Sequence, residues 1–305
     1  MKRLVLYITT VLLTTFLWGQ QQGLSTQYMF NTLAVNPAYA GTHETLSLTA
    51  DIRSQWTGIE GAPNSQTFSA HGPLEKDKIA LGLNVMHDHI GVTNFTSITP
   101  SGAYRIHFDS DKVLSLGLSF SASYYSAGLS SLSPAQNNDV AFTSDVKKWV
   151  PNFGTGAFYY TQKYYVGFSI PYLLKNNIST DNSSDLTRSN LDPHYYLTGG
   201  YVFTLDENLK LKPNFMLRGV KGNLANLDLN TNLLIDDTYG IGLSYRWSES
   251  VALVLELFLT EQLRFGYSYD YVVGGLNKVT AGSHEIMINY RFAYTKDKVV
   301  SPRYF

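Results

Sequence analysis

The stretch VLSLGLSFSA at residues 113–122 carries a large apolar side chain at every second position, with serine, glycine or alanine making up most of the rest. Alternate side chains of a β-strand point to opposite faces, so this stretch predicts a strand with one apolar face and one small, polar face. Residues 45–53, 263–271 and 285–292 repeat the alternation. About fourteen such segments follow one another between turn residues, a pattern typical of an outer-membrane β-barrel. We therefore predict an all-β fold, a transmembrane antiparallel up-and-down barrel.

A soluble two-sheet sandwich shows the same period of two, but two features of this chain argue against it. The apolar face of each segment is almost free of charge, and the one long apolar run lies at the extreme N-terminus. Lys2 and Arg3 precede the uncharged residues 4–18, and Gly19 is a small residue suited to cleavage. This arrangement predicts a secretory signal peptide over residues 1–19, with a retained signal anchor as the alternative.

The composition excludes several classes of protein. A net charge of −1 and a pI near 6.6 offer no basic surface for nucleic acid. The mean hydropathy of −0.11 is too polar for a helical membrane protein, whereas 22 Tyr and 16 Phe suit the aromatic girdles of a barrel. The sequence has no cysteine, so a lipidation site, a disulfide framework and a thiolate metal site are all excluded.

The connections between the predicted strands alternate in length. Short turns are expected at residues 75–78, 109–111, 161–163, 205–208, 236–237 and 260–262. Longer connections are expected at residues 55–64, 87–94, 127–149, 171–193, 219–225 and 274–282, with a short exception at residues 248–250. Because outer-membrane barrels have short periplasmic turns and long outer loops, we place the long connections outside the cell. Residues 20–43 are then expected as a short N-terminal periplasmic segment, residues 44–293 as the barrel and residues 294–305 as a C-terminal periplasmic tail.

Charged residues of both signs share the predicted inward phase of the strands. They are Asp51, Arg53, Arg105, His107, Lys212, Arg218, Asp228, Arg246, Glu256, Arg264, Asp270, Glu285 and Arg291. Buried charges require partners, so the favoured interpretation is a network of ion pairs that fills the lumen. Arg246, Arg264, Asp270 and Glu285 are expected among the pairs that join neighbouring C-terminal strands. The alternative is a channel lining with a field across it.

No motif in the chain indicates catalysis or a cofactor. The histidines of His87-Asp88-His89 have a spacing that could hold a metal, but they sit at a predicted strand end without an obvious third ligand. The loop at residues 176–190 is rich in Asn and Ser and is interpreted as a solvated loop. We expect no catalytic residues, no metal and no cofactor.

Several dispersed motifs give a more specific signal. QYMFN at residues 27–31 and VNPAYAG at residues 35–41 precede the first strand, and RSQW follows at residues 53–56. Further motifs are GAP at 61–63, GIGLSYR at 240–246, GYSYDY at 266–271, GSHEIM at 282–287 and SPRYF at 301–305. In this order the chain resembles the PorP/SprF family of Bacteroidetes outer-membrane proteins.

The resemblance implies a non-enzymatic component of the type IX secretion system. Such a barrel would assist secretion or surface attachment of a cargo protein with a C-terminal sorting domain, in gliding or adhesin systems, alongside other secretion components. The alternative is a passive outer-membrane channel or small-solute transporter. Candidate partner-binding residues, which could equally serve folding, are Arg53, Gln55, Trp56, Pro63, Tyr28, Asn36, Pro37 and Tyr39. The expected partners also include the outer-membrane lipid bilayer.

Overall fold

The computed structural model describes residues 25–74, 78–108, 111–132, 144–178, 190–220 and 223–292. The predicted signal peptide, residues 1–19, and the predicted tail, residues 294–305, lie outside these ranges. Its strands are β1 (Ser47–Ser54), β2 (Asn64–Pro73), β3 (Ile79–Ile90), β4 (Thr93–His107), β5 (Val113–Ala127), β6 (Val146–Tyr160), β7 (Tyr164–Ile170), β8 (Asn176–Asn177), β9 (Asn190–Leu191), β10 (His194–Tyr201), β11 (Phe203–Asp206), β12 (Leu209–Val220), β13 (Asn223–Ile235), β14 (Tyr239–Arg246), β15 (Ser250–Phe258), β16 (Leu263–Val272) and β17 (Ser283–Arg291).

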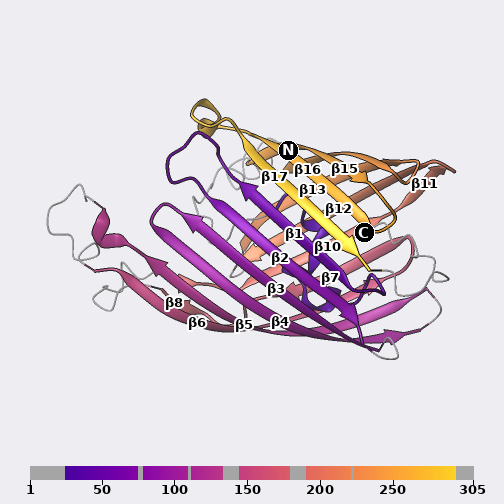
Figure 1. Ribbon diagram of the computed structural model, residues 1–305, viewed down its shortest axis with the longest axis horizontal. Helices are drawn as coiled ribbons and strands as arrows, with labels where there is room; N and C mark the ends of the chain where they lie inside the picture. The colour runs from indigo at the N-terminus through magenta and orange to yellow at the C-terminus, as the bar shows by residue number, and fades with distance from the viewer. Residues whose placement is uncertain are drawn as a thin grey trace, which may run out of the picture.

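The strands close into an antiparallel barrel, as predicted (Figure 1). β1 pairs with β17 to join the two ends of the chain, and β10 pairs with both β7 and β12. β10 and β11 are separated only by Val202 and both pair with β12, so they form one wall strand. The wall therefore has 14 strands, which confirms the expected number. β8 and β9 form a separate small sheet.

The alternation in β5 has the predicted register. Leu118 is 70% exposed on the outside of the barrel, and Leu116 and Phe120 are also exposed, whereas Ser115 is fully buried. In an outer-membrane barrel the outward apolar set faces lipid. Among the described residues no helix is long and apolar enough to cross a membrane.

The two ends of the barrel differ, and two predicted loops are wrong. All the long connections lie at one end, here called the long-loop end, and the other is the short-turn end. The expected long loops at residues 87–94 and 219–225 are instead hairpins, because β3 and β4 run on to Ile90 and Thr93, and β12 and β13 to Val220 and Asn223. Gly91, with φ of +57°, permits the tight turn between β3 and β4. The connection after β14 is short, as expected.

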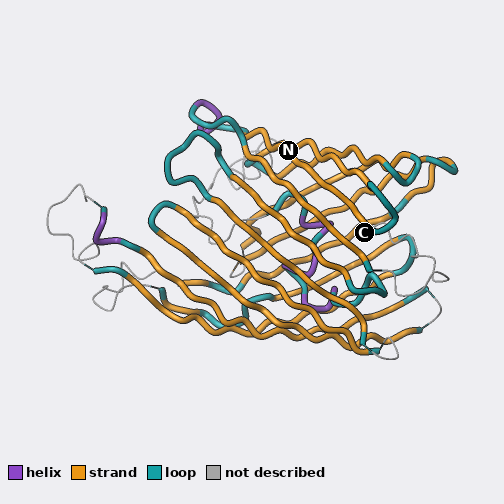
Figure 2. Tube along the Cα trace, in the orientation of Figure 1, coloured by secondary structure: helices purple, strands orange, loops and turns teal. Residues whose placement is uncertain are grey.

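Residues 25–43, here called the plug, lie within the barrel. They form three short 3-10 turns, η1 (Tyr28–Phe30), η2 (Thr32–Ala34) and η3 (Pro37–Tyr39), which Figure 2 shows surrounded by strands. Almost every side chain of the plug is buried. The sequence predicts a short periplasmic segment at residues 20–43; the structure places residues 25–43 inside the barrel, where apolar side chains and turn groups find partners on the inward faces of the strands.

Candidate functional site

The plug runs along the lumen from the long-loop end to the short-turn end. Its first described residue, Ser25, contacts Glu285, which lies near the start of β17 at the long-loop end. Its last, His43, contacts Arg291 at the opposite end of the same strand. The chain then turns back into β1, which rises to the long-loop end again. The lumen is therefore occupied along its length by the chain that precedes the first strand.

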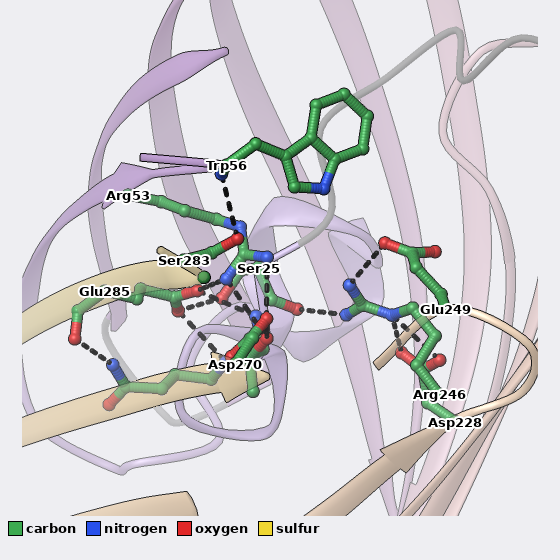
Figure 3. A network of polar contacts seen from close by, with 12 residues as sticks. Ser25, Arg53, Trp56, Asp228, Arg246, Glu249, Asp270, Ser283 and Glu285 are labelled. Atoms are coloured by element: carbon green, nitrogen blue, oxygen red, sulfur yellow. Dashed lines mark hydrogen bonds and ion pairs between the residues drawn. The ribbon is translucent and has the colours of Figure 1, made fainter. Parts of the chain in front are cut away.

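A cluster of buried polar groups, here called the latch, holds the plug at the long-loop end of the barrel (Figure 3). Arg53 donates to Asp270 Oδ2 at 2.7 Å and to Glu285 Oε2 at 2.9 Å. Glu285 also accepts hydrogen bonds from the Ser25 hydroxyl at 2.5 Å and from the Thr26 backbone N–H at 2.8 Å. The Thr26 hydroxyl donates to Asp270 at 2.7 Å. Charge-assisted bonds of this kind are roughly twice as strong as neutral ones.

The register of the strands explains why these residues meet. Arg53 lies directly opposite Glu285 where β1 pairs with β17, so the ion pair spans the seam that closes the barrel. Asp270 comes from β16, the next strand along. The Trp56 backbone N–H donates to Ser283 Oγ at 3.1 Å just beyond the pair. The latch thus joins the first strand, the last two strands and the plug.

A second group of ion pairs adjoins the latch. Arg246 on β14 bonds Asp228 on β13 at 3.1 Å and Glu249 at 3.3 Å, and it also donates to the backbone carbonyl of Ser25 at 3.4 Å. Further towards the short-turn end, Arg264 pairs with Glu256. Arg246, Arg264, Asp270 and Glu285 are therefore all paired, as expected. The two arginines pair with acids of neighbouring C-terminal strands, whereas Asp270 and Glu285 pair with Arg53 of the first strand.

The middle of the plug packs against polar and cationic groups of the wall. The Tyr28 hydroxyl donates to Asn214 Oδ1 at 3.2 Å and accepts from Asn230 Nδ2 at 2.7 Å. The Arg264 guanidinium lies 3.8 Å from the centre of the Phe30 ring, a cation–π contact. These contacts fix the aromatic side chains of QYMFN against β12, β13 and β16.

The part of the plug nearer the short-turn end packs against glycines of the wall, in a region here called the seat. Asn36 caps η3 by accepting from the Ala38 N–H at 3.0 Å, and its amide donates to the Ala157 carbonyl at 3.1 Å. A Cβ on Gly117 would overlap the backbone of Ala38, and a Cβ on Gly156 would overlap the Asn36 amide. Only glycine at these two positions lets the plug approach the strands so closely.

Between the seat and the short-turn end, aromatic rings complete the packing. Tyr39 makes edge contacts with Phe158 and with His71, at centroid distances of 5.3 and 5.4 Å. Its hydroxyl lies 3.1 Å from His43 Nε2, and the Gly41 N–H donates to His71 Nδ1 at 3.1 Å. Proline at Pro37 fits the first position of η3, where no N–H is required. The motif VNPAYAG thus encodes the turn and the contacts that hold it.

Most of the candidate partner-binding residues lie inside the barrel. The buried ones are Tyr28, Asn36, Pro37, Tyr39, Arg53 and Gln55, and the half-buried ones are Trp56 and Pro63. Arg53 lies in the latch near the long-loop end, and Tyr28 lies further along the lumen. Asn36, Pro37 and Tyr39 lie at the seat or directly beside it. Of the residues expected in the lumen, His107 is exposed at the end of β4, where the wall no longer covers it.

The sequence did not predict two features: the position of His87-Asp88-His89 inside a strand, and the path of the plug through the lumen. His87-Asp88-His89 lies inside β3, where His87 contacts Thr96 and His89 contacts Asn94, while Asp88 alone is buried. In the described residues no group of three or more His, Asp or Glu could hold a metal. The path of the plug has no periodic signal, although the runs of turn and apolar residues before β1 point to a packed segment.

The family described as "Type IX secretion system membrane protein PorP/SprF" matches residues 18–290. No curated protein matches the chain. Similar solved structures include the Acinetobacter baumannii outer membrane protein Omp33, at 10% identity and a TM-score of 0.48, covering 82% of this chain and 98% of that one. The CymD monoaromatic hydrocarbon channel is 14% identical with a TM-score of 0.49, covering 91% and 95%.

These structural likenesses carry no functional argument at such identities and TM-scores. The family match spans most of the chain, from before the plug to residue 290 in the last wall strand. The protein is an outer-membrane β-barrel, and the chain belongs to the PorP/SprF family of type IX secretion system membrane proteins.

Proposed function

We propose that this barrel is a non-enzymatic component of the type IX secretion system that assists secretion or surface attachment of a cargo protein bearing a C-terminal sorting domain. The family assignment supports a role in that system. The observation that carries the proposal further is the plug, because a filled lumen leaves the outer loops as the surface at which cargo docks. The same observation weighs against a passive channel.

Two outer loops form a joined rim next to the latch. The Thr57 N–H donates to the Gly282 carbonyl at 2.8 Å, and the Ala281 N–H donates to the Thr57 carbonyl at 2.8 Å. Residues 55–63 and 273–282 are thereby held together across the barrel seam. Leu276 and Val279 are exposed on this rim, Val279 by 61%. Loops fixed on a rigid wall are frequent sites of recognition.

The loop between β5 and β6 is held at both ends. Asp145 accepts hydrogen bonds from the Ser130 N–H at 3.1 Å and from the Ser130 hydroxyl at 2.8 Å. These bonds hold the pKa of the Asp145 carboxyl below its usual range. The bonds are therefore fully present above the ordinary carboxyl pKa and are lost as the pH falls through the lowered value. At neutral pH they fix the base of this loop.

The experiment that tests the proposal measures surface display of cargo. The double substitution Leu276→Ser and Val279→Ser removes the exposed apolar groups of the rim and leaves the wall unchanged. We expect normal barrel levels in the outer membrane and reduced labelling of cargo at the cell surface. Leu205→Ser is the matched control, because Leu205 is 57% exposed at the short-turn end. Shortening the loops at residues 128–145 and 171–193 extends the test.

Cargo display that stays unchanged in the rim variant and in both loop variants would contradict docking at the outer loops. A pull-down of cargo with the tagged barrel distinguishes direct docking from an indirect effect on secretion. Direct docking predicts that the parent protein binds cargo and that the same variants lose this binding.

A further inference from the structure

The outside of the barrel changes character toward the long-loop end of β3 to β6, four strands that lie side by side (Figure 1). The lipid-facing side chains of these strands include Ile98, Phe120 and Phe153, all of them exposed. Nearer the long-loop end, Tyr124 and Trp149 follow on the same outward face, and their ring centroids lie 5.3 Å apart. Aromatic rings of this kind sit at the interface between lipid hydrocarbon and headgroups. The residues beyond them therefore lie at the level of the headgroups.

Four polar residues, here called the polar row, cross the four strands at that level. The strand register sets His89 opposite Asn94, Asn94 opposite Ser126, and Ser126 opposite Lys147. His89 and Lys147 are exposed, and the other two residues are half-buried. Neighbouring strands lie about 4.8 Å apart, so the row is roughly 14 Å long. It presents one lysine and three hydrogen-bonding side chains on the outward face of the wall.

Cross-strand hydrogen bonds orient the histidines of this surface. His89 Nδ1 lies 2.8 Å from Asn94 Oδ1, and His87 Nδ1 lies 2.8 Å from Thr96 Oγ1. Asp88, between the two histidines, is buried, so both rings face outward. Since the Nδ1 atoms are engaged with β4, the Nε2 atoms are the ones presented to a ligand. Side chains held in this way lose little conformational freedom when a ligand binds.

The other side of the barrel has a different outward face at the same end. On β12 to β15 the outward residues near the long-loop end include Leu217, Leu229, Tyr245 and Val251, which are apolar or aromatic. A barrel needs an apolar and aromatic surface wherever it meets lipid, but it does not need a lysine and ordered polar side chains gathered on one side. The polar row is therefore a local feature of β3 to β6.

We propose that the polar row binds the phosphate-bearing sugar headgroup of a lipopolysaccharide, with the acyl chains of the lipid on the apolar wall beside it. Because the row directly continues the lipid-facing surface, a molecule that covers both must be amphiphilic. Lys147 pairs with a phosphate group, and the other three residues form hydrogen bonds with the sugar. Outer-membrane barrels carry their long loops outside, so this lipid belongs to the outer leaflet. The inference does not depend on the proposed cargo function.

The test measures lipid binding to the purified full-length barrel by native mass spectrometry, with bisphosphorylated lipid A as the probe. Phosphatidylethanolamine and lipid A without its phosphates are the comparisons. We expect the parent protein to bind bisphosphorylated lipid A more tightly than either. Lys147→Gln should raise the Kd for this lipid by about fivefold, because it removes one positive charge from contact with an anionic headgroup. The Kd for lipid A without phosphates should not change in this variant.

Lys163→Gln is the matched control, because Lys163 is an exposed lysine at the short-turn end, and it should bind lipid A like the parent protein. His89→Leu should weaken the binding of both forms of lipid A, since it removes a contact with the sugar. An equal Kd for lipid A in the parent, Lys147→Gln and His89→Leu would overturn the proposal. Equal affinity of the parent for phosphatidylethanolamine and lipid A would overturn it as well, and the row would then be an ordinary membrane interface. Reduced cargo display in Lys147→Gln with unchanged lipid A binding would instead assign the row to a protein partner.

Discussion

The two ends of the plug are held by different physical means. At the latch, Ser25 and Thr26 bond carboxylates that are themselves paired with Arg53. At the seat, η3 lies on glycines and is held mainly by shape, with the Asn36 amide as its main polar contact. The seat is also joined directly to β1, four residues beyond His43, whereas the latch holds the end of the plug that is distant in sequence.

The difference indicates which end can be released. A charge network keeps its strength only while every member is paired, so losing one member weakens the whole latch. Close packing against glycines fails only when atoms are added or removed at the contact itself. We infer that the plug at the latch is destabilised by loss of charge, whereas the plug at the seat is destabilised by a change in side-chain volume.

The largest effect is expected for Arg53→Met. It leaves Asp270 and Glu285 buried without their cation, which should lower the free energy of unfolding by about 3–5 kcal/mol. Denaturant unfolding of the purified barrel measures this loss. The double variant Arg53→Met with Asp270→Asn should lose less than the sum of the two single variants. Strict additivity would contradict a paired, buried latch.

Gly117→Val tests the seat. The added side chain overlaps the backbone of Ala38, which is held between β5 and β6, so the free energy of unfolding should fall by about 2–3 kcal/mol. Gly102→Val on the neighbouring strand is the control, because a Cβ there meets open space and should change stability by less than about 0.5 kcal/mol. Equal effects of the two substitutions would show that η3 does not rest on β5.

Asn36→Ala removes the cap of η3 and the bond to the Ala157 carbonyl. We expect a loss of about 1–2 kcal/mol, measured in the same unfolding experiment. Asn36→Ser keeps the cap but cannot reach Ala157, so its loss should be intermediate. If Asn36→Ser were as damaging as Asn36→Ala, the contact with the wall rather than the cap would hold this turn.

Ser25→Ala should have the smallest effect, about 1 kcal/mol or less, because Glu285 keeps its bonds from Arg53 and from the Thr26 N–H. A loss as large as that of Arg53→Met would mean that the plug, rather than the β1–β17 seam, supplies most of the stability of the latch.

The wall was predictable because its signal is local. Each strand repeats the period of two, as in β5, and the turns are marked by short runs of polar residues. The inward charges were also predictable, since phase alone assigns Arg53, Arg246 and Glu285 to the lumen. The failures occurred where polar residues continue a strand: His87, Asp88 and His89 suggested a loop, although their alternation continues to Ile90.

The plug could not be placed from the sequence. Its turns have no period, and several of its partners lie more than one hundred residues away, such as Ala157 for Asn36 and Glu285 for Ser25. Glycine at 117 and 156 is compatible with any barrel strand, so its purpose becomes visible only when η3 is seen against it. Long-range contacts of this kind are set by the closed wall, which sequence patterning does not describe.

In the proposed function the plug closes the lumen and leaves the outer rim as the surface at which cargo docks. Closure is measured as the conductance of the intact purified protein in a planar bilayer, with a barrel lacking residues 25–43 as the comparison. We predict that the intact protein gives no sustained conductance and that the shortened barrel does. A steady, pore-sized conductance from the intact protein would contradict the account and would favour a passive channel.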